Sequence, residues 1–126
     1  MKSYTDLEQS KKLAEVLPLE SADMCYIQDL LVGCKYGEYR PYIGDLIPAY
    51  GQDKIRCWSL SALLNVIHKH IKDYNVLRID ISENDFAIWY DEVGFGVNND
   101  LPDITMESPV DACVKMILEL KEKNLL

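Results

Sequence analysis

Apolar residues recur at helical spacing between Trp58 and Ile71, which is the clearest helix signal in the chain. The residues that share one helical face are Leu60, Leu63, Leu64, Ile67 and Ile71. Ser59 directly precedes them and is a good N-cap, because its hydroxyl can accept a hydrogen bond from a backbone N–H of the first turn. Trp58 can fold back over that turn as a hydrophobic staple. The pattern therefore predicts a central core helix over 59–71.

A second amphipathic helix is predicted over 109–123. Ser108 is its expected N-cap, Pro109 occupies the first helical position, and Asp111 occupies the third, where a carboxylate interacts favourably with the helix dipole. Its apolar face comprises Val110, Cys113, Val114, Ile117 and Leu118. We expect Leu64 and Ile117 to be core positions of these two helices, and Asp111 to pair with Lys115 one turn later.

The first helix is predicted to begin at Ser3 or Thr5 and to end before Pro18, since the residue that precedes a proline is driven out of the α region. Its apolar positions are Leu7, Leu13, Ala14, Val16 and Leu17. Because this apolar stripe is thin, we expect a peripheral helix that lies against the main body.

Alternation of apolar and other residues, which is typical of strands, is clearest over 74–91. The alternating apolar residues are Leu77, Ile79, Ile81, Phe86, Ile88 and Tyr90. The intervening residues 82–85 have the composition of a turn, so this segment predicts a β-hairpin. Shorter strands are predicted over 22–27 and 104–106, whereas residues 28–34 fit either a strand or a helical turn.

Residues 34–54 lack a period and are interrupted by glycine and proline, which predicts a long irregular segment. Its tyrosines are interleaved with charged residues such as Arg40; they are Tyr36, Tyr39, Tyr42 and Tyr50. Tyrosine among small and polar residues is typical of adaptable protein contacts. The alternative is that the rings fix the loop to the core while their hydroxyls stay in solvent.

These elements predict a single α+β domain over residues 1–126. An antiparallel sheet built on the hairpin would be covered on one face by the helices 59–71 and 109–123, with the N-terminal helix at the periphery. No apolar run approaches the roughly 20 residues that span a bilayer, so no membrane association is expected. The polar N-terminus has no apolar signal core, and we therefore expect a cytoplasmic protein.

The net charge of −8 is concentrated in one part of the chain. Residues 73–111 contain ten acids and a single base, Arg78. This acidity argues against direct binding of nucleic acid, because phosphate contacts rely on Lys and Arg. It fits a solvated face that maintains solubility, a docking surface for a basic partner, or an acidic imitation of nucleic acid that occupies the groove of a DNA-handling protein.

The four cysteines contain no C-x-x-C pair, and we interpret them as reduced thiols, with no metal and no cofactor. On the predicted helix, His68 and His70 would lie about 200° apart and could not share a metal. The same helix would separate Cys57 from both histidines. A small thiol-dependent enzyme that uses Cys34 or Cys57 beside a histidine nevertheless remains an alternative function.

The segments 57–64 and 108–123, separated by a β-hairpin, resemble a group of small uncharacterised bacterial proteins that are often found in phage or mobile-element neighbourhoods. The resemblance covers about the last 70 residues and transfers no catalytic residue. What it implies is an accessory binding protein.

The absence of a catalytic motif and the tyrosine-rich segment together favour a non-enzymatic protein-binding or regulatory module. Its partner is expected to be a protein, and a homodimer is compatible with this interpretation. The candidate contact residues are Tyr36, Tyr39, Arg40, Tyr42, Tyr50, Glu83 and Asp85.

Overall fold

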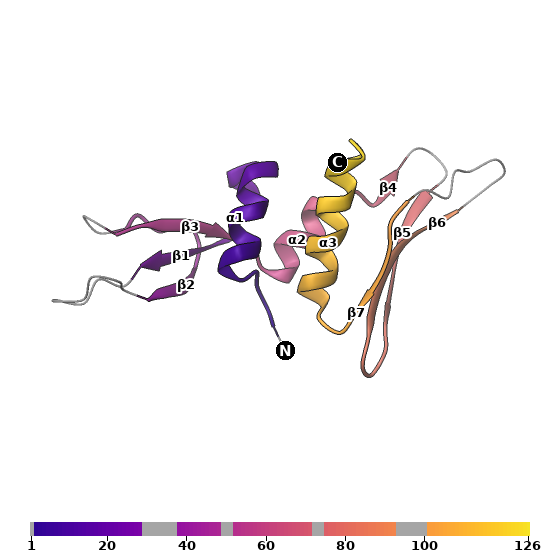
Figure 1. Cartoon of the computed structure of the whole chain (residues 1–126), viewed down its shortest axis with the longest axis horizontal. Helices are drawn as coiled ribbons and strands as arrows, with labels where there is room; N and C mark the ends of the chain where they lie inside the picture. Colours follow the sequence, from indigo (N-terminus) through magenta and orange to yellow (C-terminus); the bar gives the residue numbers. More distant parts are fainter. Residues whose placement is uncertain (1, 29–37, 49–51, 72–74, 93–100) are drawn as a thin grey trace.

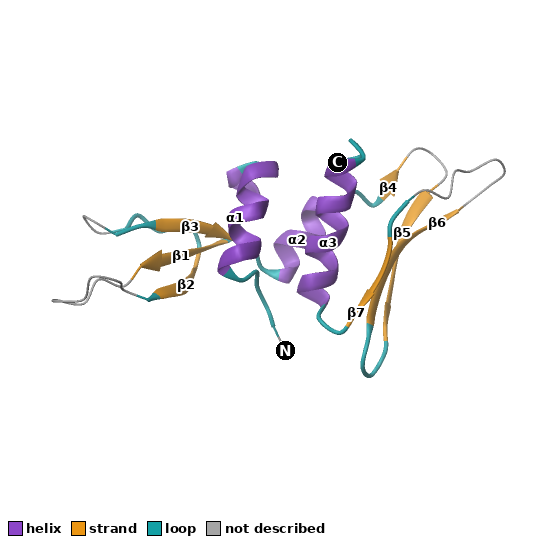
Figure 2. Ribbon diagram, in the orientation of Figure 1, coloured by secondary structure: helices purple, strands orange, loops and turns teal. Residues whose placement is uncertain are grey.

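A layer of helices separates two antiparallel sheets (Figure 1). The computed structural model describes residues 2–28, 38–48, 52–71, 75–92 and 101–126. Within them are the helices α1 (Leu7–Val16), α2 (Leu60–Val66) and α3 (Pro109–Glu122), together with a short 3-10 helix, η1 (Leu19–Ser21). Helices and strands contribute comparably, so the predicted α+β class is confirmed (Figure 2).

The first helix begins later than either predicted start, Ser3 or Thr5. Its N-cap is Asp6, whose carboxylate accepts from the backbone N–H of Gln9, while the Gln9 side chain accepts from the backbone N–H of Asp6. The helix ends before Pro18, as predicted. It is not peripheral: α1 packs between the smaller sheet and α3, and Leu13 is completely buried. A thin apolar stripe is sufficient here because small buried residues such as Ser10 also face the interior.

The central helix begins as predicted but ends early. The Ser59 hydroxyl accepts from the backbone N–H of Ala62, which confirms the N-cap. Helix α2 ends at Val66, and its C-cap, Ile67, is already extended, so the prediction of a helix through residue 71 is wrong. The last part instead forms the strand β4 (His70–Ile71), held by a 2.8 Å hydrogen bond from the backbone N–H of Leu77 to the carbonyl of Lys69. Tertiary strand pairing here overrides the helical pattern.

The smaller sheet consists of β1 (Met24–Gln28), β2 (Tyr39–Ile43) and β3 (Lys54–Cys57), in the order β2-β1-β3. The strand predicted over 22–27 is confirmed by β1. The irregular structure predicted over 34–54 is wrong for β2 and for the start of β3. Pro41 is tolerated within β2 because this strand lies at the edge of the sheet, where a missing backbone N–H need not break a ladder.

The larger sheet contains the predicted hairpin. It comprises β4, β5 (Asn75–Ile81), β6 (Phe86–Glu92) and β7 (Asp103–Met106), in that order. Helix α3 covers this sheet over β6 and β7, while α2 packs against α3. Residues 29–34, for which a strand or a helical turn was predicted, lie outside the described residues.

The hydrophobic core joins α1, α2, α3 and the inner face of the larger sheet. Its largest fully buried side chains are Trp58, Leu13, Leu63, Ile67, Ile88, Met116, Ile117 and Leu120. Ile117 therefore is a core residue, as predicted, whereas Leu64 is only partly buried against this cluster. The Trp58 indole N–H donates to the Ser21 hydroxyl over 2.9 Å, so its buried polar atom is satisfied.

Candidate functional site

Several large apolar side chains are exposed at the end of β2 and in the residues after it. Ile43 and Ile47 are 85% and 93% exposed, and Tyr42 and Leu46 are both 41% exposed. We call these four residues the β2 surface. Four large exposed apolar side chains within residues 42–47 make this segment a candidate contact site.

The backbone at Gly44 directs the chain across the smaller sheet. Gly44 has φ of +91°, a conformation that favours glycine, and its N–H donates to the carbonyl of Asp23 over 2.7 Å. The next residue, Asp45, then reaches β3 on the far side of the sheet. Its carboxylate contacts both Lys54 and Arg56, with a distance of 2.9 Å to Arg56 Nη1. Residues 43–47 are thus attached by the β1–β2 pairing, by the Gly44 hydrogen bond and by this ion-pair cluster.

Several charged and aromatic side chains share the face of the sheet that Asp45 crosses. The register aligns Arg40 with Ile27 and Lys54 in one row, and Tyr42 with Cys25 and Arg56 in the next. Residues directly opposite each other in an antiparallel sheet project to the same side. Arg40, Tyr42, Lys54 and Arg56 therefore lie on one face, whose β1 positions, Cys25 and Ile27, are buried.

The predicted contact residues fall into two separate groups. Tyr39, Arg40 and Tyr42 lie on β2, and Tyr36 and Tyr50 lie outside the described residues. The Tyr39 hydroxyl donates to Asp53 over 3.3 Å. The alternative interpretation left tyrosine hydroxyls in solvent, whereas this hydroxyl is hydrogen-bonded; Tyr42 is 41% exposed.

Glu83 and Asp85 form the second group, at the exposed turn between β5 and β6. The turn is closed by a 2.9 Å hydrogen bond from the backbone N–H of Ser82 to the carbonyl of Asp85. This hairpin belongs to the other sheet, beyond the helical layer (Figure 1). The structure therefore does not bring the two groups of candidate residues together.

Several acidic residues of the larger sheet share one face, but a cation lies among them. From the register, Asp80, Asp91 and Asp103 project from the face opposite the buried Ile88, together with Trp89. Arg78 lies on the same face and contacts Asp91 over 3.5 Å. A continuous ridge of carboxylates, which an imitation of nucleic acid requires, is interrupted by this cation.

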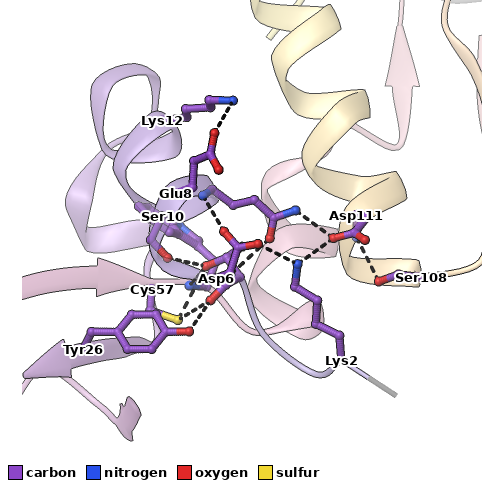
Figure 3. Close-up of polar contacts among 12 residues, drawn as sticks. Lys2, Asp6, Glu8, Ser10, Lys12, Tyr26, Cys57, Ser108 and Asp111 are labelled. Atoms are coloured by element: carbon purple, nitrogen blue, oxygen red, sulfur yellow. Dashed lines mark hydrogen bonds and ion pairs between the residues drawn. The ribbon is translucent and has the colours of Figure 1, made fainter. Parts of the chain in front are cut away.

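Cys57 lies in a buried polar cluster beside α1 (Figure 3). Its thiol donates to the carbonyl of Thr5 over 3.4 Å, and the Tyr26 hydroxyl donates to the same carbonyl over 2.7 Å. Burial raises the pKa of the Cys57 thiol, which opposes formation of a thiolate. Nucleophilic cysteines need the reverse shift, so this geometry gives Cys57 a structural role.

The other cysteines and the histidines give the thiol hypothesis no further support. Burial also raises the pKa of Cys113, to about 12. His68 is exposed after α2, and His70 lies on β4. Cys34 lies outside the described residues. Among the residues that the structure describes, no group of three or more histidine, cysteine, aspartate or glutamate side chains could hold a metal ion.

The N-terminal segment is tied to α3 by a charged cluster that the sequence pattern did not predict (Figure 3). Lys2 Nζ lies 2.7 Å from Asp111 Oδ1 and 3.1 Å from Asp6 Oδ2, and Gln9 Nε2 donates to the same Asp111 oxygen over 2.7 Å. Asp111 therefore pairs with residues more than 100 positions away. Helical spacing had suggested Lys115 as its partner, and no local signal identifies Lys2.

The sequence pattern also missed Ile43, Leu46 and Ile47. The available signal was three large apolar residues within a segment that is interrupted by Gly44 and Pro48 and has no period. Apolar residues that belong to no periodic element are candidates for a surface contact, because no core face is defined for them.

Comparisons with family models, with curated proteins and with solved structures found no match for this chain. The resemblance to small bacterial accessory proteins thus stays a prediction. None of the described helices is both long enough and apolar enough to cross a bilayer.

Proposed function

We propose that this protein is a non-enzymatic protein-binding or regulatory accessory module that contacts its partner through the β2 surface. The observation that carries the proposal is the exposure of Ile43 and Ile47, in the same segment as the exposed Tyr42 and Leu46. Covering these side chains with a partner would remove apolar surface from water, which is the main favourable term in protein association.

The surroundings of the β2 surface also suit a protein partner. Interfaces combine an apolar centre with a polar rim, and they are enriched in Tyr and Arg. Here the apolar side chains are flanked by Arg40 on the strand and by Asp45 in the crossing segment. A protein partner does not require a concave site, whereas a small molecule does.

The hairpin turn with Glu83 and Asp85 is proposed as a second, separate contact region, for a basic part of a partner. We further propose that the protein acts in the cytoplasm, where thiols such as Cys25, Cys57 and Cys113 remain reduced. An accessory role agrees with what the resemblance of 57–64 and 108–123 implies.

A quantitative pull-down from the cells that express the protein tests this proposal. The variant Tyr39→Ala with Tyr42→Ala alters β2, and Lys12→Ala, at an exposed position of α1 outside both proposed contact regions, serves as the control. Circular dichroism first establishes that both variants fold. We expect the β2 variant to lose a partner that the wild type retains. Capture of the same partners by the wild type and by both variants would contradict the proposal.

A further inference from the structure

A groove runs along the outer edge of β3, between this strand, α1 and η1. Its volume is about 430 Å³, and it is lined by Lys11, Ala14, Leu19, Lys54, Ile55 and Arg56. Every charged residue in this lining is a cation, although the chain as a whole carries a net charge of −8. The floor is apolar, and Leu19 is 43% exposed there. The groove thus combines positive charge with uncovered apolar surface.

The strand that borders the groove has an unpaired edge among the described residues, since β3 pairs only with β1. The backbone N–H of Gln28 donates to the carbonyl of Asp53, so this pair is hydrogen-bonded, and the bonded pairs recur at every second residue of an antiparallel ladder. Ile55 and Cys57 therefore direct their backbone groups toward β1. Lys54 and Arg56, which alternate with them, direct theirs toward the groove.

The side chains of β3 alternate between the two faces of the sheet. Ile55 shares the face of Tyr26 and Cys57, on which α1 packs, whereas Lys54 and Arg56 project from the other face. A strand added to this edge would place every second side chain beside Ile55, Ala14 and Leu19. The intervening side chains would lie beside the two cations.

The structure already contains a carboxylate on these cations. Lys54 and Arg56 both contact the same oxygen of Asp45, which belongs to the exposed segment after β2. The Asp45 side chain is itself 54% exposed. Lys54 and Arg56 are therefore arranged to bind a carboxylate, and the one present could be exchanged for another without unfolding the core.

We propose that the groove binds an extended segment of a partner protein in which apolar and acidic residues alternate, added as a further antiparallel or parallel strand to β3. This inference rests on the proposed function and deepens it by naming the chemistry of a partner segment and a further surface that binds it. Main-chain hydrogen bonds would supply affinity, as in other cases of strand addition, and the alternating side chains would supply specificity. Lys11 adds a further positive charge from α1.

Fluorescence anisotropy with a labelled octapeptide of alternating valine and glutamate tests the proposal. A peptide with lysine in place of glutamate controls for charge, and the acidic peptide with alternate backbone nitrogens methylated controls for strand pairing. Lys11→Glu, and separately Lys54→Gln with Arg56→Gln, alter the groove. Lys12→Glu is the matched control on the same helix, since Lys12 contacts Glu8 outside the groove. Thermal melting establishes that each variant folds.

We expect the acidic peptide to bind, and each groove variant to weaken it by about two- to fivefold or more, the effect of losing one or two exposed ion pairs. Lys12→Glu should leave its affinity unchanged. Asp45→Asn should strengthen binding by about two- to fivefold, because the internal carboxylate no longer competes.

Four results would overturn the inference: no binding of the acidic peptide, equal binding of the lysine peptide, equal binding of the methylated peptide, or affinity unchanged by the groove variants. A homodimer that dissociates on Lys11→Glu would also overturn it, since a second copy would then occupy the edge. The Tyr39→Ala, Tyr42→Ala variant should retain peptide binding. If the acidic peptide does not bind but the pull-down still depends on β2, this inference is removed and the proposed function stands.

Discussion

Ile79 lies directly opposite Ile88 in the β5–β6 ladder, yet Ile88 is completely buried and Ile79 is 41% exposed. The two side chains share one face of the larger sheet. The difference arises because α3 packs mainly over β6 and β7, and far less over β5. Two isoleucines at paired positions thus differ in burial: Ile88, on the strand that the helix covers, is in the core, and Ile79 is at the surface.

This pair provides the first prediction. Replacing Ile88 with alanine should lower the free energy of unfolding by roughly 2–5 kcal/mol, the range for emptying a core position. Ile79→Ala should cost about 0.5 kcal/mol, because most surface substitutions have small effects. Urea denaturation of the two variants compares them. Equal losses would mean that β5 is covered as well as β6.

The core assignment of the helices yields a second prediction. Ile117→Ala and Leu63→Ala should each cost roughly 2–5 kcal/mol, because both side chains are completely buried. Leu64→Ala should cost about 1 kcal/mol, since this neighbour is only partly buried. Thermal and urea unfolding give the three values. A larger loss of stability at Leu64 than at Leu63 would mean that Leu64, and not Leu63, lies on the inward face of α2.

The cluster of Lys2, Asp111 and Gln9 predicts a pH-dependent contribution. Burial would raise the pKa of Asp111, but its hydrogen bonds to Lys2 and Gln9 outweigh burial and lower that pKa below 3.8. The folded state therefore favours the ionised form of Asp111. The contribution of this carboxylate to stability is present above pH 3.8 and is lost as the pH falls through the folded pKa. At Lys2 burial likewise opposes the net shift, and the pKa is raised above 10.5.

Asp111→Asn should therefore lower the free energy of unfolding by about 1 kcal/mol near neutral pH, since both partners are about one-third exposed and partly screened. The loss should shrink below pH 3.8. Asp103→Asn, at an exposed position of β7, is the control. A loss that stays constant from neutral to strongly acidic pH would show that the carboxylate charge has no part in it.

The buried thiols predict slow alkylation of the native protein. Burial raises the pKa of both Cys57 and Cys113, so at neutral pH neither should react with iodoacetamide faster than a free cysteine. Peptide mass mapping of a time course measures each site. Because the folded pKa values exceed the ordinary value of 9.0, stability should also fall as the pH rises above 9. Rapid modification of Cys57 would revive the thiol-dependent function.

The sequence predicted those elements whose local pattern agrees with their packing. Ser59 and Ser108 were recognisable as N-caps, and the alternation across the hairpin was confirmed by its register. The end of α2 could not be predicted, because the pairing of residues 70 and 71 with β5 is a long-range preference that overrides helical spacing. Strand β2 was hidden by Pro41, which reads as a breaker and is tolerated only because the strand lies at an edge.

The site was less predictable than the fold. Tyr42 and Arg40 could be proposed from composition, but Ile43 and Ile47 look like core residues until the structure shows that nothing among the described residues covers them. The groove beside β3 brings together Lys11, Leu19 and Arg56, which are separated in sequence. Such juxtapositions depend on tertiary packing and leave no local signal.

Site-specific photocrosslinking tests the central claim most directly. A benzophenone-bearing amino acid is placed at Ile43 and, as a control on an exposed helix position, at Lys12, and each protein is irradiated in the cells that express it. The account predicts a discrete crosslinked protein from position 43 that is absent from position 12 and is lost when Ile47 is also changed to serine. No crosslink from position 43, or the same products from both positions, would contradict a protein-binding role for the β2 surface.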